Sequence, residues 1–130
     1  MSKSVTSFGD FVRYLRERRD LSLRELGRLA DIDHAYIHRL ESGEKESPSD
    51  EIVSALRRAL KVSPTEAALL SGLRARAAPS SLVELLLGPE GESYTDLFDA
   101  ALSMSFRGVR PESSNDWKKF LDKLRAFQSA

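Results

Sequence analysis

The residues with the greatest capacity for chemistry lie close together, between positions 33 and 43. His34, His38 and Glu41 have the i, i+4, i+7 spacing of a single helical face, which could offer three metal ligands. The segment lacks the internal glutamate of a His-Glu-x-x-His zinc motif, and the other ionisable residues have no catalytic arrangement. We therefore expect no metal, no cofactor and no enzymatic activity, and a protein that works mainly by binding.

Charge and composition limit what the chain could bind. The 20 Lys and Arg residues balance 20 Asp and Glu residues, which argues against coating nucleic acid through bulk charge, so any such contact must be local and specific. Cysteine is absent, which excludes disulfides and thiol chemistry and is compatible with a reducing compartment. No apolar run approaches the roughly 20 residues of a membrane span, and we expect a cytoplasmic protein without a membrane anchor.

Helical periodicity dominates the chain and predicts an all-α fold. A first helix is indicated from Phe8 to about Arg19, with apolar residues at i, i+3, i+4 and i+7. Ser22-Leu-Arg-Glu25 is a capping box that starts a second helix, which runs to about Ala30, and Asp33 can cap a third that ends at Ser42-Gly43. These three helices must position the histidine-containing segment.

Two further helices complete the first part of the chain. Pro48-Ser49-Asp50 opens a fourth, and Ser63-Pro-Thr-Glu66 is a capping box with proline at the first helical position of a fifth. We predict a five-helix domain over residues 1–73, a linker over 74–81 rich in Arg, Ala, Pro and Ser, and a second module over 82–130. That module shows three shorter helical patterns, at about 81–87, 94–105 and 114–128.

The turn between the second and third helices carries a family resemblance. Ala30-Asp-Ile-Asp33 is short and places an apolar residue between two crossing helices. The stretch LRERRDLSLRELGRLADIDHAYIHRLESG resembles the Cro and phage-repressor (XRE) family of helix-turn-helix transcriptional regulators, and the resemblance covers about residues 8–62. It implies a lambda-repressor-like fold whose third helix reads the major groove of a double-stranded DNA operator.

The resemblance also implies roles for individual residues. Arg16 and Glu41 match a structural ion pair that joins the first helix to the end of the third. Arg39 matches a base-reading position, where its planar guanidinium could donate to O6 and N7 of guanine, although it could also be solvated or paired with a carboxylate. The other matched positions are base-reading His34, Ala35 and His38, and backbone-contacting Arg24, Arg28, Asp33 and Lys45, for several of which an ordinary solvated role is an alternative.

Two departures from the family pattern affect the contacts with the DNA backbone. Leu23 stands where many members have a glutamine that bonds a phosphate or a base. Glu44 and Glu46 flank Lys45 in a loop that tends to be basic in the family. We expect at least one backbone contact to be weaker for this reason.

The last fifty residues supply three apolar helical faces for a very small core. Such a module often needs a second copy of itself to cover its apolar faces. We therefore expect a homodimer that places two recognition helices one DNA turn apart. The residues assigned to dimerisation or regulation are Leu86, Phe98, Leu102, Phe106, Arg107, Trp117, Leu121 and Leu124.

The segment between the last two predicted helices indicates how binding is controlled. Its Arg107-Gly-x-Arg-Pro111 and Asp116-Trp117 elements resemble those of repressors inactivated by a partner zinc metallopeptidase, which cleaves the dimerising module. A structural turn with a core tryptophan is the alternative for these residues. Two other functions remain open: an antitoxin-type autorepressor whose C-terminal module neutralises a toxin, and an interaction scaffold that binds no DNA.

Overall fold

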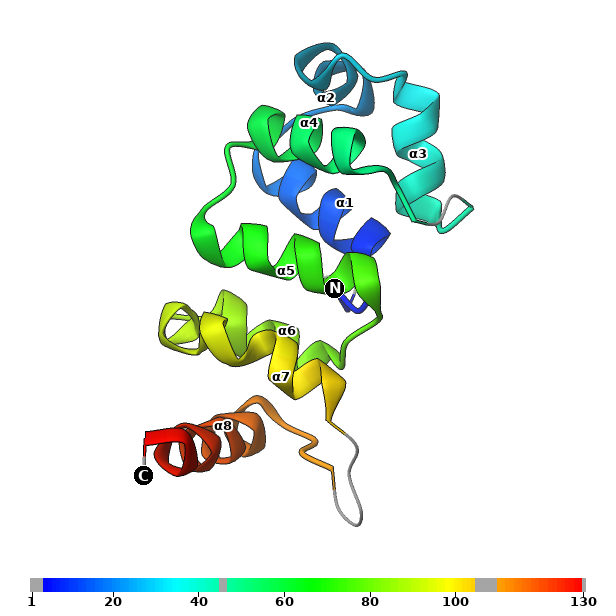
Figure 1. The fold of residues 1–130 in the computed structure, drawn as a ribbon. Helices are drawn as coiled ribbons and strands as arrows, with labels where there is room; N and C mark the ends of the chain where they lie inside the picture. Colours follow the sequence, from blue (N-terminus) through cyan, green and yellow to red (C-terminus); the bar gives the residue numbers. More distant parts are fainter. Residues whose placement is uncertain (1–3, 45–46, 105–109, 130) are drawn as a thin grey trace.

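The computed structural model describes residues 4–44, 47–104 and 110–129, and within these ranges it contains helices and no strand. The prediction of an all-α fold is therefore confirmed. Figure 1 shows the helices stacked from the α2–α3 end of the molecule to α8 at the other end. Their order is α1 (Phe8–Arg18), α2 (Leu23–Ala30), α3 (His34–Ser42), α4 (Asp50–Leu60), α5 (Pro64–Ala75), α6 (Ser80–Leu87), the 3-10 helix η1 (Gly91–Leu97), α7 (Phe98–Ser103) and α8 (Ser114–Ser129).

Side chains at the helix starts fix the boundaries of the first five helices. The Ser22 hydroxyl accepts the backbone N–H of Glu25, and the Glu25 carboxylate accepts the N–H of Ser22. That backbone hydrogen bond from Ser22 lowers the pKa of Glu25. Ser63 and Glu66 form the same reciprocal cap at the start of α5. These bonds satisfy amides that have no partner within the helix, so each predicted start lies within a residue of the observed one.

Glycine allows the helices around α3 to approach closely. A β-carbon added to Gly9 in α1 would lie 2.0 Å from the carbonyl oxygen of Leu40, and one added to Gly27 in α2 would lie 2.7 Å from that of Ile32. The N–H of Ile32 also donates to the carbonyl of Gly27 across the turn, over 2.9 Å. Any larger residue at Gly9 would therefore push α1 away from the third helix.

The C-terminal part packs directly on α5 rather than standing apart from it. The buried residues form one cluster that runs from α1 to α8. Only residues 76–79 lie between α5 and α6, and the N–H of Ala78 there donates to the carbonyl of Thr6. The end of α5 at Ala75 and the start of α6 at Ser80 therefore both fall within the predicted 74–81 linker. Independent folding of the two parts stays a prediction.

The middle of the C-terminal part differs from the single helix expected over about 94–105. The chain forms the 3-10 helix η1 and then the short helix α7, which ends at Ser103. A β-carbon on Gly91 would lie 1.7 Å from the carbonyl oxygen of Leu86, so η1 lies against the end of α6 with no space for a side chain. The hydroxyls of Thr65 and Thr95 are 3.0 Å apart and join η1 to the start of α5.

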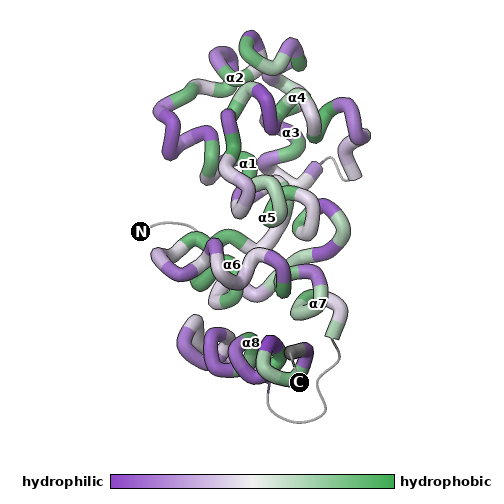
Figure 2. Tube along the Cα trace, turned by 60° about the vertical axis from the view of Figure 1, so that its left-hand side comes forward, coloured by the Kyte–Doolittle hydropathy of each residue, from purple (hydrophilic) through white to green (hydrophobic). Residues whose placement is uncertain are grey.

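Polar contacts at several points attach α8. The indole N–H of Trp117 donates to the hydroxyl of Ser81 over 3.0 Å, and the Ser114 hydroxyl donates to the Ser81 carbonyl over 3.1 Å. In the middle of the helix, the Tyr94 hydroxyl donates to the Asp122 carboxylate over 2.6 Å. Figure 2 shows hydrophilic and hydrophobic residues alternating along α8, as in an amphipathic helix with one face against α6. Over the described ranges, no helix has both the length and the apolar character needed to cross a lipid bilayer.

Candidate nucleic-acid interface

The recognition helix α3 has one buried face and one open face. Ile37 and Leu40 are buried in the core, on the side that packs against α1 and α2. His34 and His38 are exposed, and Ala35 and Arg39 are half-buried. The structure therefore places all four predicted base-reading residues outside the core. They lie between the buried positions in the sequence and on another side of the helix.

Two further features of α3 were not identified from the sequence: Ser42 lies on its open side, and Tyr36, which packs against the core, contacts Arg39. Ser42 is exposed and continues the i, i+4 series of His34 and His38, a periodicity that could have revealed it. Tyr36 is half-buried, and the guanidinium carbon of Arg39 lies 6.0 Å from the centre of its ring. This cation–π distance gives Arg39 a preferred resting position, at the edge of the open face.

A bidentate ion pair fixes the end of α3 to α1. Nε and Nη2 of Arg16 donate to the two carboxylate oxygens of Glu41 over 2.8 and 2.9 Å, and Nη1 donates to the carbonyl of Leu21 over 2.9 Å. The side chains retain 13% and 5% of their exposure, so the pair is shielded from water. The hydrogen bond to Glu41 raises the pKa of Arg16. Because three elements meet at one guanidinium, the orientation of α3 is set by contacts on its buried side.

The start of α3 borders a shallow hollow of about 670 Å³, lined by Arg24 and Arg28 of α2, the turn that joins the two helices, and His34. The carboxylate of Asp33 caps α3 by accepting the N–H of Ala35 over 3.0 Å. Both arginines are exposed. Two cations and the helix N-terminus therefore face a space that suits a phosphate, while the carboxylates of Asp31 and Asp33, which line the same space, oppose it.

The two departures from the family pattern have different structural outcomes. Leu23 is half-buried and packs against the core, so its side chain supports α2 instead of extending toward a ligand. Glu44 is exposed just beyond the end of α3. Lys45 and Glu46 lie outside the described residues.

The histidine face does not form a ligand set. Both carboxylate oxygens of Glu41 accept from Arg16, and Glu41 is buried, whereas His34 and His38 are exposed. In the described parts of the chain, no group of three His, Cys, Asp or Glu residues is arranged to hold a metal ion.

The residues predicted for dimerisation or regulation mostly lie inside the chain itself. Leu86, Phe98, Trp117 and Leu121 are buried, and Leu102 and Leu124 are half-buried against the same core. Phe106 and Arg107 lie outside the described residues. From the same motif, Arg110 lies with its guanidinium carbon 5.9 Å from the centre of the Trp117 ring. The structure thus brings the Arg-Pro and Asp-Trp elements into contact.

Helix α3 packs against the helix that precedes it, exposes a polar face and has cations beside its N-terminus. Helix-turn-helix DNA-binding regulators have this arrangement. Residues 7–70 match the family described as "Helix-turn-helix domain", a span that includes α1 to α4 and the first half of α5. Residues 7–70 therefore form a helix-turn-helix domain, which supports a DNA-binding regulator. No curated protein matches the chain.

Proposed function

We propose that this protein is a sequence-specific transcriptional repressor of the XRE type that binds a palindromic operator as a dimer. The observation that carries the proposal is the division of α3 into a locked face and an open face. The Arg16–Glu41 ion pair fixes the buried side of the helix to α1. His34, His38 and Arg39 lie outside the core, where they can contact bases. Pre-positioned side chains lose less conformational freedom on binding, which favours specific recognition.

The charge balance supports specific rather than general binding of DNA. With no net charge on the chain, attraction to phosphates depends on local groups such as Arg24 and Arg28. Arg39 is the strongest candidate for a base contact, because its five donors fit the paired acceptors of guanine. The histidines add single hydrogen bonds, and Ala35 could contact a thymine methyl group.

The proposal is tested by selecting operators from a random duplex library and measuring affinity by fluorescence anisotropy. Arg39→Ala should weaken operator binding by about 5- to 150-fold, the equivalent of one bidentate base contact, and should relax the preference at one base pair. Arg57→Ala is the matched control, because Arg57 is an exposed arginine on α4. The base-reading assignment is wrong if Arg39→Ala binds the selected operator as tightly as the wild type and the Arg57 control.

We further propose that binding is relieved when a zinc metallopeptidase cleaves the chain beside Arg107. The contact of Arg110 with Trp117 supports this, because it links the segment before α8 to a buried anchor of that helix. Cleavage would free α8 from its covalent connection to the rest of the fold. Co-purification with the product of an adjacent gene distinguishes the alternatives: cleavage by a metallopeptidase supports relief by proteolysis, whereas a stable stoichiometric complex supports a toxin partner.

A further inference from the structure

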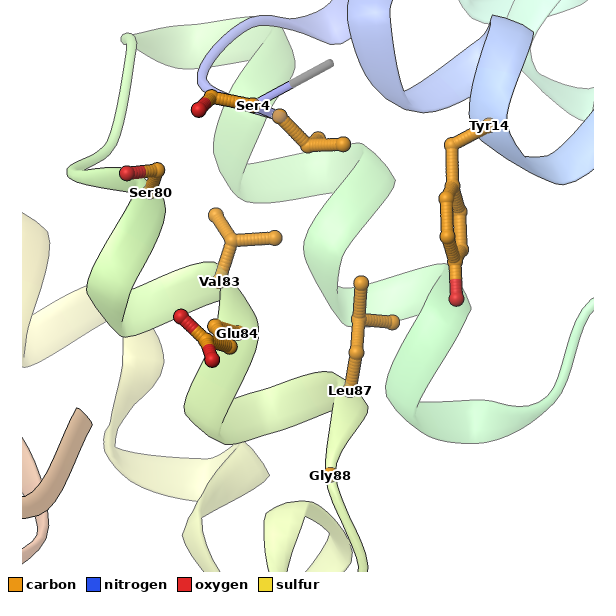
Figure 3. A pocket seen from close by; sticks show the side chains of 8 residues that line it. Ser4, Tyr14, Ser80, Val83, Glu84, Leu87 and Gly88 are labelled. Carbon is orange, nitrogen blue, oxygen red and sulfur yellow. The ribbon is translucent and has the colours of Figure 1, made fainter. Parts of the chain in front are cut away.

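A hollow that the DNA-binding role does not use lies between α1 and α6 (Figure 3). It holds about 510 Å³ and is lined by Ser4, Val5, Tyr14, Ser80, Val83, Glu84, Leu87 and Gly88. Pockets for small molecules generally have volumes of about 300–1,000 Å³. We propose that this hollow binds a small amphipathic organic cation, an ammonium group carried on an aromatic or aliphatic body.

The wall of the hollow favours an apolar body. Val83 is buried and Leu87 is half-buried, and Figure 3 shows both side chains directed toward the space between α6 and Tyr14. The Tyr14 ring stacks on Phe11 with 5.8 Å between ring centres and 12° between planes. A ring fixed in this way is a preformed surface for an apolar or aromatic group, and its placement costs little entropy on binding.

The charge of the hollow determines the sign of the ligand. Glu84 is the one ionisable carboxylate or cation on its wall among the described residues. Glu84 is exposed and forms no salt bridge or side-chain hydrogen bond with any described residue. The hydroxyls of Ser4 and Ser80 provide further acceptors nearby. An ammonium group would pair with Glu84 here, whereas an anion would be repelled.

Arg18 sets the orientation of the ligand. Its guanidinium donates to the Tyr14 hydroxyl over 3.2 Å, and its central carbon lies 5.7 Å from the centre of the Tyr14 ring. A second cation at this end would meet an existing positive charge. The ammonium group therefore binds at the Glu84 end, and the apolar body points toward Tyr14.

The position of the hollow gives binding a structural consequence. Its walls come from α1, which carries Arg16, from Ser4 and Val5 in the segment before α1, and from α6, on which α8 packs. A ligand that contacts both helices binds only while they are together, so it stabilises their association by mass action. Binding at this hollow does not depend on which DNA sequence the protein reads.

The experiment titrates the full-length protein with phenethylammonium and follows the methyl signals of Val83 and Leu87 by NMR. Shifts at these methyl groups that saturate are expected, with 2-phenylethanol binding more weakly and phenylacetate not at all. Glu84→Gln should weaken phenethylammonium binding by about two- to fivefold, as expected for a solvent-exposed ion pair. Glu92→Gln is the matched control, because Glu92 is an exposed glutamate in the neighbouring hollow beyond Leu87.

Several outcomes would overturn the proposal. Equal affinities for phenethylammonium and 2-phenylethanol would remove the role of Glu84, as would equal effects of the Glu84 and Glu92 substitutions. Methyl shifts that follow protein concentration instead of added amine would identify a second copy of the chain as the occupant. Shifts confined to residues away from Val83 and Leu87 would place the amine elsewhere.

Discussion

Replacing Glu41 by alanine tests the contact on which the orientation of α3 depends. The substitution removes both carboxylate oxygens that Arg16 contacts at 2.8 and 2.9 Å. Arg16 then keeps only the Leu21 carbonyl among its close acceptors, in a site where its side chain is 13% exposed. An unpaired cation in such a site loses most of its solvation without compensation.

The size of the effect follows from burial. Removing one partner of a buried pair typically costs about 3–5 kcal/mol, and the partial exposure of Arg16 together with its remaining hydrogen bond moves the expectation to about 2–3 kcal/mol. For a chain of 130 residues, this corresponds to a fall in Tm of roughly 6–12 °C. The double variant Arg16→Met, Glu41→Leu should recover most of the loss, because apolar residues of similar size need no solvation.

Thermal unfolding followed by circular dichroism provides the measurement, and Glu17→Ala provides the control. Glu17 pairs with Arg13 over 3.1 Å, but these side chains are 57% and 50% exposed. A surface pair of this kind contributes about 0.5 kcal/mol or less, so the control should lower Tm by at most about 2 °C. If Glu41→Ala unfolds within 2 °C of Glu17→Ala, the Arg16–Glu41 pair does not fix the orientation of α3.

Three further predictions concern α8, the start of α3 and the C-terminal part. The hydrogen bond to Asp122 raises the pKa of Tyr94 to about 12. The stability that this bond contributes is therefore complete below pH 10 and is lost as pH rises through 12. In urea unfolding, Tyr94→Phe should lack this alkaline loss, and identical pH profiles of variant and wild type would contradict the assignment. Asp33→Asn keeps the cap but removes a charge that repels phosphate, so anisotropy should show tighter non-specific DNA binding at low salt, and unchanged affinity would place the backbone elsewhere. A fragment ending at Ala78 should fold as a monomer of reduced stability and bind operator orders of magnitude more weakly; sedimentation and anisotropy test this, and a fragment that dimerises and binds like the full chain would locate the two-fold contact in α1 to α5.

Helix starts were predictable because each is encoded within four consecutive residues. The Ser22–Glu25 and Ser63–Glu66 caps need no information from the rest of the fold. The exposed face of α3 was predictable for a similar reason, since Ile37 and Leu40 alternate with the polar positions at helical spacing. Local periodicity thus determines both the element and the side it presents.

Apart from the Arg16–Glu41 pair, which the family resemblance implied, contacts between distant parts of the chain were not predicted. Glu66 was recognised as a cap, but its carboxylate also accepts from Arg19 over 2.9 Å, which joins the end of α1 to the start of α5. The helix expected over 94–105 begins instead as a 3-10 helix, because Gly91 lies against the Leu86 carbonyl. Both outcomes follow from contacts between elements, which periodicity does not encode.

The arrangement of the C-terminal part changes the physical argument for a dimer. The apolar faces that suggested a twin are largely covered within one chain, with Trp117 and Leu121 buried against α6 and its neighbours. Among the described residues of this part, apolar surface stays open at Met104 and along one flank of α8, where Phe120 and Leu124 are half-buried and Phe127 is 82% exposed. Figure 1 places α8 at the opposite end of the molecule from α3. A dimer formed through this flank must therefore have a two-fold axis along the length of the stack, since an axis across it would send the two recognition helices to opposite ends and prevent them from reaching successive turns of one DNA duplex.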